Sequence, residues 1–283
     1  MMSVQIPRIP LGAWLEAFTD NMVEWCSGAT RAFSTVAGNG IDMLESLLGS
    51  IPPWAFIPVV ALLAWRATRK PGIGAFALLG FGLIWNLGLW EATMSTIALV
   101  LVATALAVVT GVPLGIAAAV NVTVRKVLMP ALDLMQTMPA FVYLIPAIPF
   151  FGLGKVAAVF ATVVFAMPPA IRFTCLGIRQ VPDDLVECAE AFGTSRWQRL
   201  GKLELPLAAP TILAGVNQTI MLALSMVVIA AMIGARGLGG EVWKAIQRLE
   251  LGSGFEAGIG IVIVAICLDR VLQHIGRRSS VDR

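Results

Sequence analysis

Long apolar stretches without a charged residue alternate with short polar segments along most of this chain. A transmembrane helix needs about 20 mainly apolar residues, and most of these stretches reach that length. The pattern therefore predicts an all-α, polytopic transmembrane bundle of about seven spans. The predicted spans are residues 46–65, 71–90, 92–124, 134–154, 156–171, 207–235 and a seventh centred on 257–268.

Prolines and polar residues within the predicted spans are candidates for a translocation path. Broken helices at membrane depth are tolerated only against protein or a water-filled cavity. The fourth and fifth spans are predicted to be interrupted, at Pro139, Pro146, Pro149, Pro168 and Pro169. Polar groups in lipid are costly and usually face the interior of the bundle. The candidate path residues are Gln136, Thr137, Pro139, Tyr143, Asn217, Gln218 and Ser225. The alternative for each polar residue is an ordinary hydrogen bond between helices.

The first 50 residues have a helical pattern of a different kind. Apolar residues recur at helical spacing, with acidic and amide residues between them. The apolar positions are Leu11, Trp14, Leu15, Phe18, Met22 and Trp25. Two interpretations remain open, a helix lying on the outer membrane surface and a helix packed on the transmembrane bundle.

The composition agrees with a lipid environment, and the basic residues predict an orientation. Apolar residues make up 58% of the chain and charged residues 13%, whereas soluble domains carry about 25% charged residues. With the N-terminus outside, fourteen Lys and Arg residues fall on the inner side and six on the outer side. Because basic residues favour the cytoplasmic side, we expect the N-terminus outside and the C-terminus in the cytoplasm.

The sequence gives no indication of covalent chemistry. It has one histidine and no C-x-x-C pair, so neither a metal site nor a Ser-His-Asp set is predicted. It contains no Walker A motif. No basic block with interleaved aromatic residues suggests nucleic acid. We therefore expect no enzyme activity and no cofactor in this chain, and energy for any pumping would come from a partner.

The longest polar segment, residues 182–206, has helix signals on both sides of a glycine. Asp183 and Asp184 favour a helix start, and Gly193 suits a sharp turn. Thr194 or Ser195 can then cap a second helix. The segment predicts a compact helical hairpin, placed in the cytoplasm by the charge distribution, that a partner subunit can grip.

The same segment resembles the cytoplasmic "EAA" loop of ABC importer permeases. The resemblance rests on Glu187, Ala189, Gly193, Leu203, Leu205 and Pro206. Cys188 stands where the family has its first alanine, and a small residue still fits there. Residues 133–154, 215–239 and 255–270 are similar to permeases of glycine betaine, proline betaine and choline importers. Arg236 departs from the usual glycine in an outward loop, which could alter docking of the binding protein.

The resemblance implies a type I ABC importer permease in a bacterial inner membrane. Residues 1–50 would be an outer amphipathic segment, 51–90 two accessory helices, 91–272 the permease domain and 273–283 a cytoplasmic tail. The implied partners are two ABC ATPase subunits, a second copy of the permease and an external substrate-binding protein. The implied cargo is glycine betaine, proline betaine, choline or carnitine. The alternatives are another small polar solute or, in a different class, an ion-coupled secondary transporter.

Overall fold

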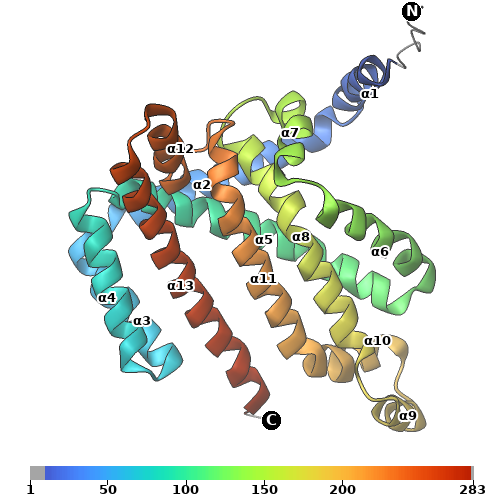
Figure 1. Ribbon diagram of the computed structural model, residues 1–283. Helices are drawn as coiled ribbons and strands as arrows, with labels where there is room; N and C mark the ends of the chain where they lie inside the picture. Colours follow the sequence, from blue (N-terminus) through green and yellow to red (C-terminus); the bar gives the residue numbers. More distant parts are fainter. Residues whose placement is uncertain (1–9, 282–283) are drawn as a thin grey trace, which may run out of the picture.

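The computed structural model describes residues 10–281, except for the side chains of residues 11, 13, 15 and 272–281. Within that range every regular element is a helix, and the elements form a bundle (Figure 1). In chain order they are α1 (Leu11–Trp25), α2 (Ser27–Ser50), α3 (Pro53–Thr68), α4 (Pro71–Asn86), α5 (Trp90–Val120), α6 (Val122–Thr137), η1 (Ala140–Tyr143), α7 (Leu144–Phe151), α8 (Lys155–Arg179), α9 (Asp183–Ala191), α10 (Arg196–Arg199), η2 (Leu200–Glu204), α11 (Leu205–Ala231), α12 (Leu238–Arg248) and α13 (Leu251–Val281).

Four helical stretches are long and apolar enough to cross a membrane: α5, α8, Arg196–Ala231 and Leu251–Val271. Two bent pairs raise the number to six, α2 with α3 and α6 with the η1–α7 segment. The predicted count of seven is reached only if the short apolar helix α4 is added. The predicted fold class, an all-α transmembrane bundle, is confirmed. The predicted tail, residues 273–283, falls outside the described side chains.

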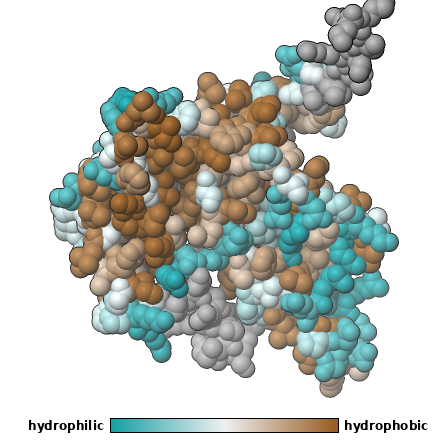
Figure 2. Space-filling view, viewed as in Figure 1, coloured by the Kyte–Doolittle hydropathy of each residue, from teal (hydrophilic) through white to brown (hydrophobic). Residues whose placement is uncertain are grey.

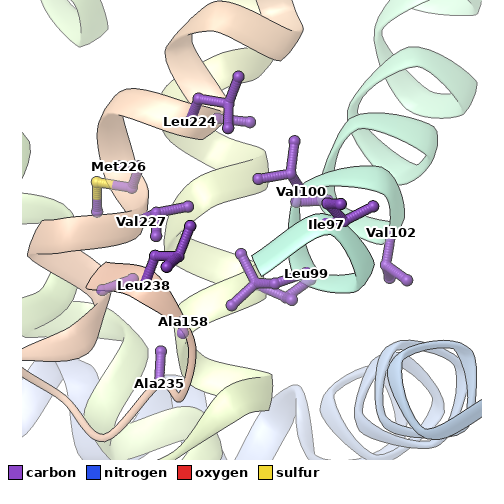
Figure 3. Close-up of a cluster of buried hydrophobic side chains, with 14 of the residues drawn as sticks. Ile97, Leu99, Val100, Val102, Ala158, Leu224, Met226, Val227, Ala235 and Leu238 are labelled. Atoms are coloured by element: carbon purple, nitrogen blue, oxygen red, sulfur yellow. The ribbon is translucent and has the colours of Figure 1, made fainter. Parts of the chain in front are cut away.

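The core of the bundle is formed by α5, α8 and α11, which pack closely on one another. Figure 3 shows their small and branched side chains meeting at the centre. The labelled residues include Ile97, Leu99, Val100, Ala158, Leu224, Met226 and Val227. A Cβ at Gly115 would lie 2.6 Å from the Cβ of Thr174, so α5 approaches α8 more closely than any side chain at that position allows.

Much of the bundle's outer surface is apolar. Figure 2 shows apolar residues over α12 and α13, whereas polar residues gather over α6 and near α9. Leu79, Phe255 and Val262 are among the large apolar side chains that remain exposed. An apolar patch of this extent is unusual on a soluble monomer but suits contact with lipid.

The fourth predicted span is not a straight helix. A helix begins earlier than expected, at Val122, because the Asn121 side chain accepts hydrogen bonds from the backbone of Thr123 and Val124. It ends at Thr137, and the chain then turns by 113° into the η1–α7 segment. Pro139 lies at this break because the residue before a proline is disfavoured in the helical conformation.

The prediction that prolines break the fifth span is wrong. Helix α8 runs without interruption through Pro168 and Pro169, and both residues are buried. Protein neighbours surround this part of α8, so its freed carbonyl groups do not face lipid. Pro146 and Pro149, in the fourth predicted span, both lie within α7, and neither of them ends that helix.

The two helices of the first 50 residues, α1 and α2, differ in how they pack on the bundle. Helix α2 packs on α5 and α8, with Ala37 and Ile41 buried. The ring of Phe33 lies 5.2 Å from that of Phe151. Lys155 at the start of α8 forms ion pairs with residues of α2, including Glu45 at 3.6 Å. The bundle-packing interpretation therefore holds for α2, whereas Trp25 at the end of α1 is 87% exposed.

Candidate functional site

The polar segment after α8 folds into a compact hairpin at one end of the bundle (Figure 1). Gly193 forms the turn between α9 and α10 with φ +74°, a conformation that favours glycine. The Thr194 hydroxyl donates a hydrogen bond to the Ala189 carbonyl at 2.7 Å. Ser195 then starts α10 through a capping box with Gln198. The predicted helix–glycine–helix hairpin is present, and Ser195, not Thr194, is the cap.

An ion-pair cluster connects the hairpin to the start of α11. Nε of Arg199 donates to Glu204 at 2.7 Å, and the same guanidinium group pairs with Glu190 of α9. Glu204 is only 7% exposed. A buried carboxylate is costly unless it is paired, so Arg199 is required for the packing of Glu204. The cluster joins α9 to α11 and makes the hairpin one rigid unit with the span that follows.

The predicted loop residues fall into two groups. Glu187 is exposed on α9, Ala189 is half-buried, and Gly193 is at the turn. The second group, Leu203, Leu205 and Pro206, is half-buried where η2 joins α11. The first group therefore lies on the accessible part of the hairpin, and the second anchors it to the membrane-spanning helix.

Two aromatic residues that the sequence did not predict as binding residues also belong to the accessible surface of the hairpin. Phe192 is 86% exposed and Trp197 is 78% exposed. Large exposed aromatic residues are unusual on a polar hairpin and are enriched where one protein binds another. Their signal in the sequence was their position on either side of Gly193 in an otherwise polar segment.

A groove of about 690 Å³ runs beside the hairpin. It is bounded by the ends of α5 and α8 and by α9 and α10. Arg179, Arg196 and Trp197 are among its lining residues. The groove separates one side of the hairpin from the ends of α5 and α8. Polar and aromatic side chains on that side are accessible to a partner.

The candidate path residues on the bent segment are mostly exposed. Gln136, Thr137 and Pro139 lie at the break after α6, and none of them is covered by this chain. The Thr137 hydroxyl donates to the Leu134 carbonyl at 2.9 Å. Tyr143 is instead buried, and its hydroxyl donates to the Met135 carbonyl across the bend. Tyr143 therefore stabilises the bend and does not line an open surface.

The candidates on α11 divide in the same way. Asn217 donates to the Asp269 carboxylate at 2.9 Å, which joins α11 to α13 as an ordinary interhelical hydrogen bond. Gln218 and Ser225 are exposed. They are seven residues apart and so lie on one face of the helix, together with Ala214. This α11 face has polar side chains and no cover from the described part of the chain.

Among the residues whose side chains the structure describes, no group of three or more His, Cys, Asp or Glu is arranged to hold a metal ion.

Residues 111–281, which include α8, the hairpin and α11, match the family described as binding-protein-dependent transport system inner membrane component. The chain belongs to this family. The inner membrane location of the family agrees with the apolar helices of this member.

Several members of the family with known names are similar to this chain over nearly its whole length. The glycine betaine transport system permease protein OpuAB of Bacillus subtilis is 52% identical over 96% of both chains. The glycine betaine/carnitine transport permease protein GbuB of Listeria monocytogenes is 48% identical over 97% of this chain and 98% of its own. The glycine betaine/proline betaine permease protein ProW of Escherichia coli is 46% identical over 96% of this chain and 76% of its own.

The fold of this family member also matches solved structures. A chain of the MetNI methionine ABC transporter, solved in inward-facing conformations, superposes with a TM-score of 0.59. The match covers 65% of this chain and 92% of the other, at 22% sequence identity. The shared bundle confirms the predicted type I ABC importer fold.

Proposed function

We propose that this chain is the membrane-spanning permease subunit of an ATP-driven importer for a quaternary ammonium osmolyte, one of glycine betaine, proline betaine, choline or carnitine. The observation that carries the proposal is the rigid hairpin of α9 and α10 with its exposed aromatic residues. An importer that is driven by a separate ATPase needs a rigid surface on its membrane subunit to which the ATPase can bind. The cargo is inferred from the names of the relatives at 46% to 52% identity.

The hairpin is proposed as the docking site for an ABC ATPase subunit. Glu187 and Ala189 would contact the ATPase and Gly193 would form the turn that presents them, whereas Leu205 and Pro206 would transmit the movement of the ATPase to α11. The Arg199 cluster supports this division because it joins the hairpin to α11. A movement imposed on a rigid element displaces the helix attached to it.

The exposed α11 face is proposed to meet a second copy of the permease. Its polar residues Gln218 and Ser225, with Gln136 and Thr137 at the bend, would then line a path between the two copies. Polar side chains at membrane depth normally face protein or a water-filled path, which supports this arrangement. Two ATPase subunits would close on ATP, move the paired hairpins and open the path to the outside.

The proposed orientation puts the hairpin and the C-terminus in the cytoplasm, and the N-terminus and α12 outside. The excess of basic residues on the hairpin side supports it. A substrate-binding protein would deliver cargo at the outer end. Residues 91–272 would act as the permease domain, 51–90 as accessory helices and 1–50 as the outer segment.

Glu187→Lys should disrupt ATPase docking without unfolding the chain, because Glu187 is exposed and makes no ion pair among the described residues. Affinity purification of the permease in mild detergent should recover the ATPase with the wild type. Recovery should fall at least about fivefold with the variant, since charge reversal opposes a complementary surface. The matched control is Glu250→Lys, an exposed acid at the opposite end, which should recover the ATPase normally. Equal recovery with both variants would contradict the assigned docking surface.

A further inference from the structure

A pocket of about 450 Å³ with several charged residues in its wall lies at the end of the bundle opposite the hairpin. In Figure 1 this end is marked by α12, while α9 and α10 lie at the other end. The pocket is formed by the start of α5, the turn between α11 and α12, and the start of α12. Its charged and aromatic lining residues are Glu91, Arg236, Glu241, Trp243 and Lys244.

The backbone that carries Arg236 is held in one conformation. Gly237 has φ +115°, and a Cβ there would lie 2.5 Å from the Thr96 hydroxyl oxygen. That hydroxyl accepts a hydrogen bond from the Leu238 N–H at 2.8 Å. A Cβ at Gly239 would lie 2.4 Å from the Val227 carbonyl oxygen. The turn is therefore packed directly against α5 and α11, and this packing fixes the position of the Arg236 backbone.

Two opposite charges in this pocket are unpaired. Lys244 and Glu241 form an ion pair at 2.8 Å. Arg236 and Glu91 are both exposed, and neither forms an ion pair with the other or with any other side chain that the structure describes. Trp243 lines the same pocket and is half-buried. The pocket thus offers a free cation, a free anion and an aromatic ring.

We infer that this pocket binds the zwitterionic members of the proposed cargo class, such as glycine betaine, which have both a carboxylate and a quaternary ammonium group. The carboxylate fits Arg236, whose guanidinium group suits two parallel hydrogen bonds. The quaternary ammonium fits Glu91 and Trp243, because aromatic faces and carboxylates attract such cations. A volume of about 450 Å³ is within the range of small-molecule sites. This inference rests on the proposed function and adds a first contact site at the outer end.

The free anion distinguishes this ligand from a docking protein. An acidic side chain of a binding protein would be attracted by Arg236 but repelled by Glu91. A zwitterion uses both residues. Choline lacks the carboxylate, and 3,3-dimethylbutanoate has a carbon in place of the charged nitrogen. Each of these two molecules satisfies only one half of the pocket.

The test uses the permease–ATPase complex in lipid nanodiscs without binding protein, titrated with glycine betaine in saturation-transfer NMR. Arg236→Gln and Glu91→Gln should each raise the dissociation constant about 3- to 10-fold, a range set by the exposure of both groups. Choline and 3,3-dimethylbutanoate should bind the wild type more weakly than glycine betaine by a similar factor. The matched control is Arg248→Gln, an exposed arginine of α12 outside the pocket, which should bind like the wild type.

Equal binding by the wild type and both pocket variants would overturn the inference, as would choline binding as tightly as glycine betaine. Absence of saturable binding would overturn this inference alone, provided that the same complex takes up betaine with ATP when it is reconstituted into proteoliposomes with binding protein. Weaker docking of the binding protein to Arg236→Gln without any betaine binding would also overturn it and assign Arg236 to the protein interface. Absence of ATP-driven uptake by the wild type in those proteoliposomes would contradict the proposed function instead.

Discussion

Gly193→Pro should abolish ATP-driven uptake by the assembled transporter, to less than about a tenth of the wild-type rate. Gly193 has φ +74°, whereas proline fixes φ at about −65°. The Gly193 N–H also donates to the Glu190 carbonyl at 2.9 Å, and proline has no such donor. Loss of this bond with a change of φ costs on the order of 3 kcal/mol, which is enough to reorganise a short hairpin. Uptake of labelled substrate and recovery of the ATPase are the measurements.

Gly193→Asn is the matched control. Asparagine adopts the left-handed conformation more readily than other residues with a side chain and keeps the backbone N–H. Within this chain a Cβ at Gly193 meets no atom within 4 Å, so the added side chain does not disturb the hairpin. The asparagine variant should therefore retain most of the uptake. If the proline variant transports as well as the asparagine variant, the shape of the hairpin does not matter for coupling.

Arg199→Met should destabilise the chain by about 2 kcal/mol, the usual value of a hydrogen bond to a charged group. The variant leaves Glu204 buried without its cation, and methionine cannot replace the bonds that Arg199 donates to Glu204 and Glu190. The apparent melting temperature of the detergent-solubilised permease should fall, and the ATPase should be recovered less efficiently.

The double variant Arg199→Met with Glu204→Gln should recover part of the melting temperature, because a neutral amide is less costly to bury than a carboxylate. Arg196→Met is the control for the loss of a loop arginine, since Arg196 is exposed and forms no ion pair among the described residues. A melting temperature as low for Arg196→Met as for Arg199→Met would mean that the cluster does not hold the hairpin.

The hairpin was predictable because its signals are local. The left-handed turn at Gly193 and the cap at Ser195 depend on residues within a few positions of each other. The Arg199 cluster was not predictable, because Glu190 and Glu204 meet one guanidinium group only after α9 has folded back. The exposure of Phe192 and Trp197 also depends on the tertiary fold.

The spans were predictable as apolar stretches but not in their shape. Proline alone does not decide whether a helix breaks, as Pro139 and Pro168 show. Pro139 lies at a 113° bend, whereas Pro168 continues a buried helix. The difference lies in the neighbouring helices, which the order of residues does not reveal. The pocket at Arg236 and Glu91 likewise joins positions that are 145 residues apart.

The central claim is that this permease imports its cargo with energy from a separate ATPase. The most direct test is uptake of labelled glycine betaine into proteoliposomes that contain this chain with the ATPase and binding protein of the same organism. The proposal predicts uptake that requires ATP on the hairpin side and binding protein on the opposite side, and that continues when ionophores dissipate all ion gradients. Uptake by the isolated chain without ATP, driven by an ion gradient, would contradict it.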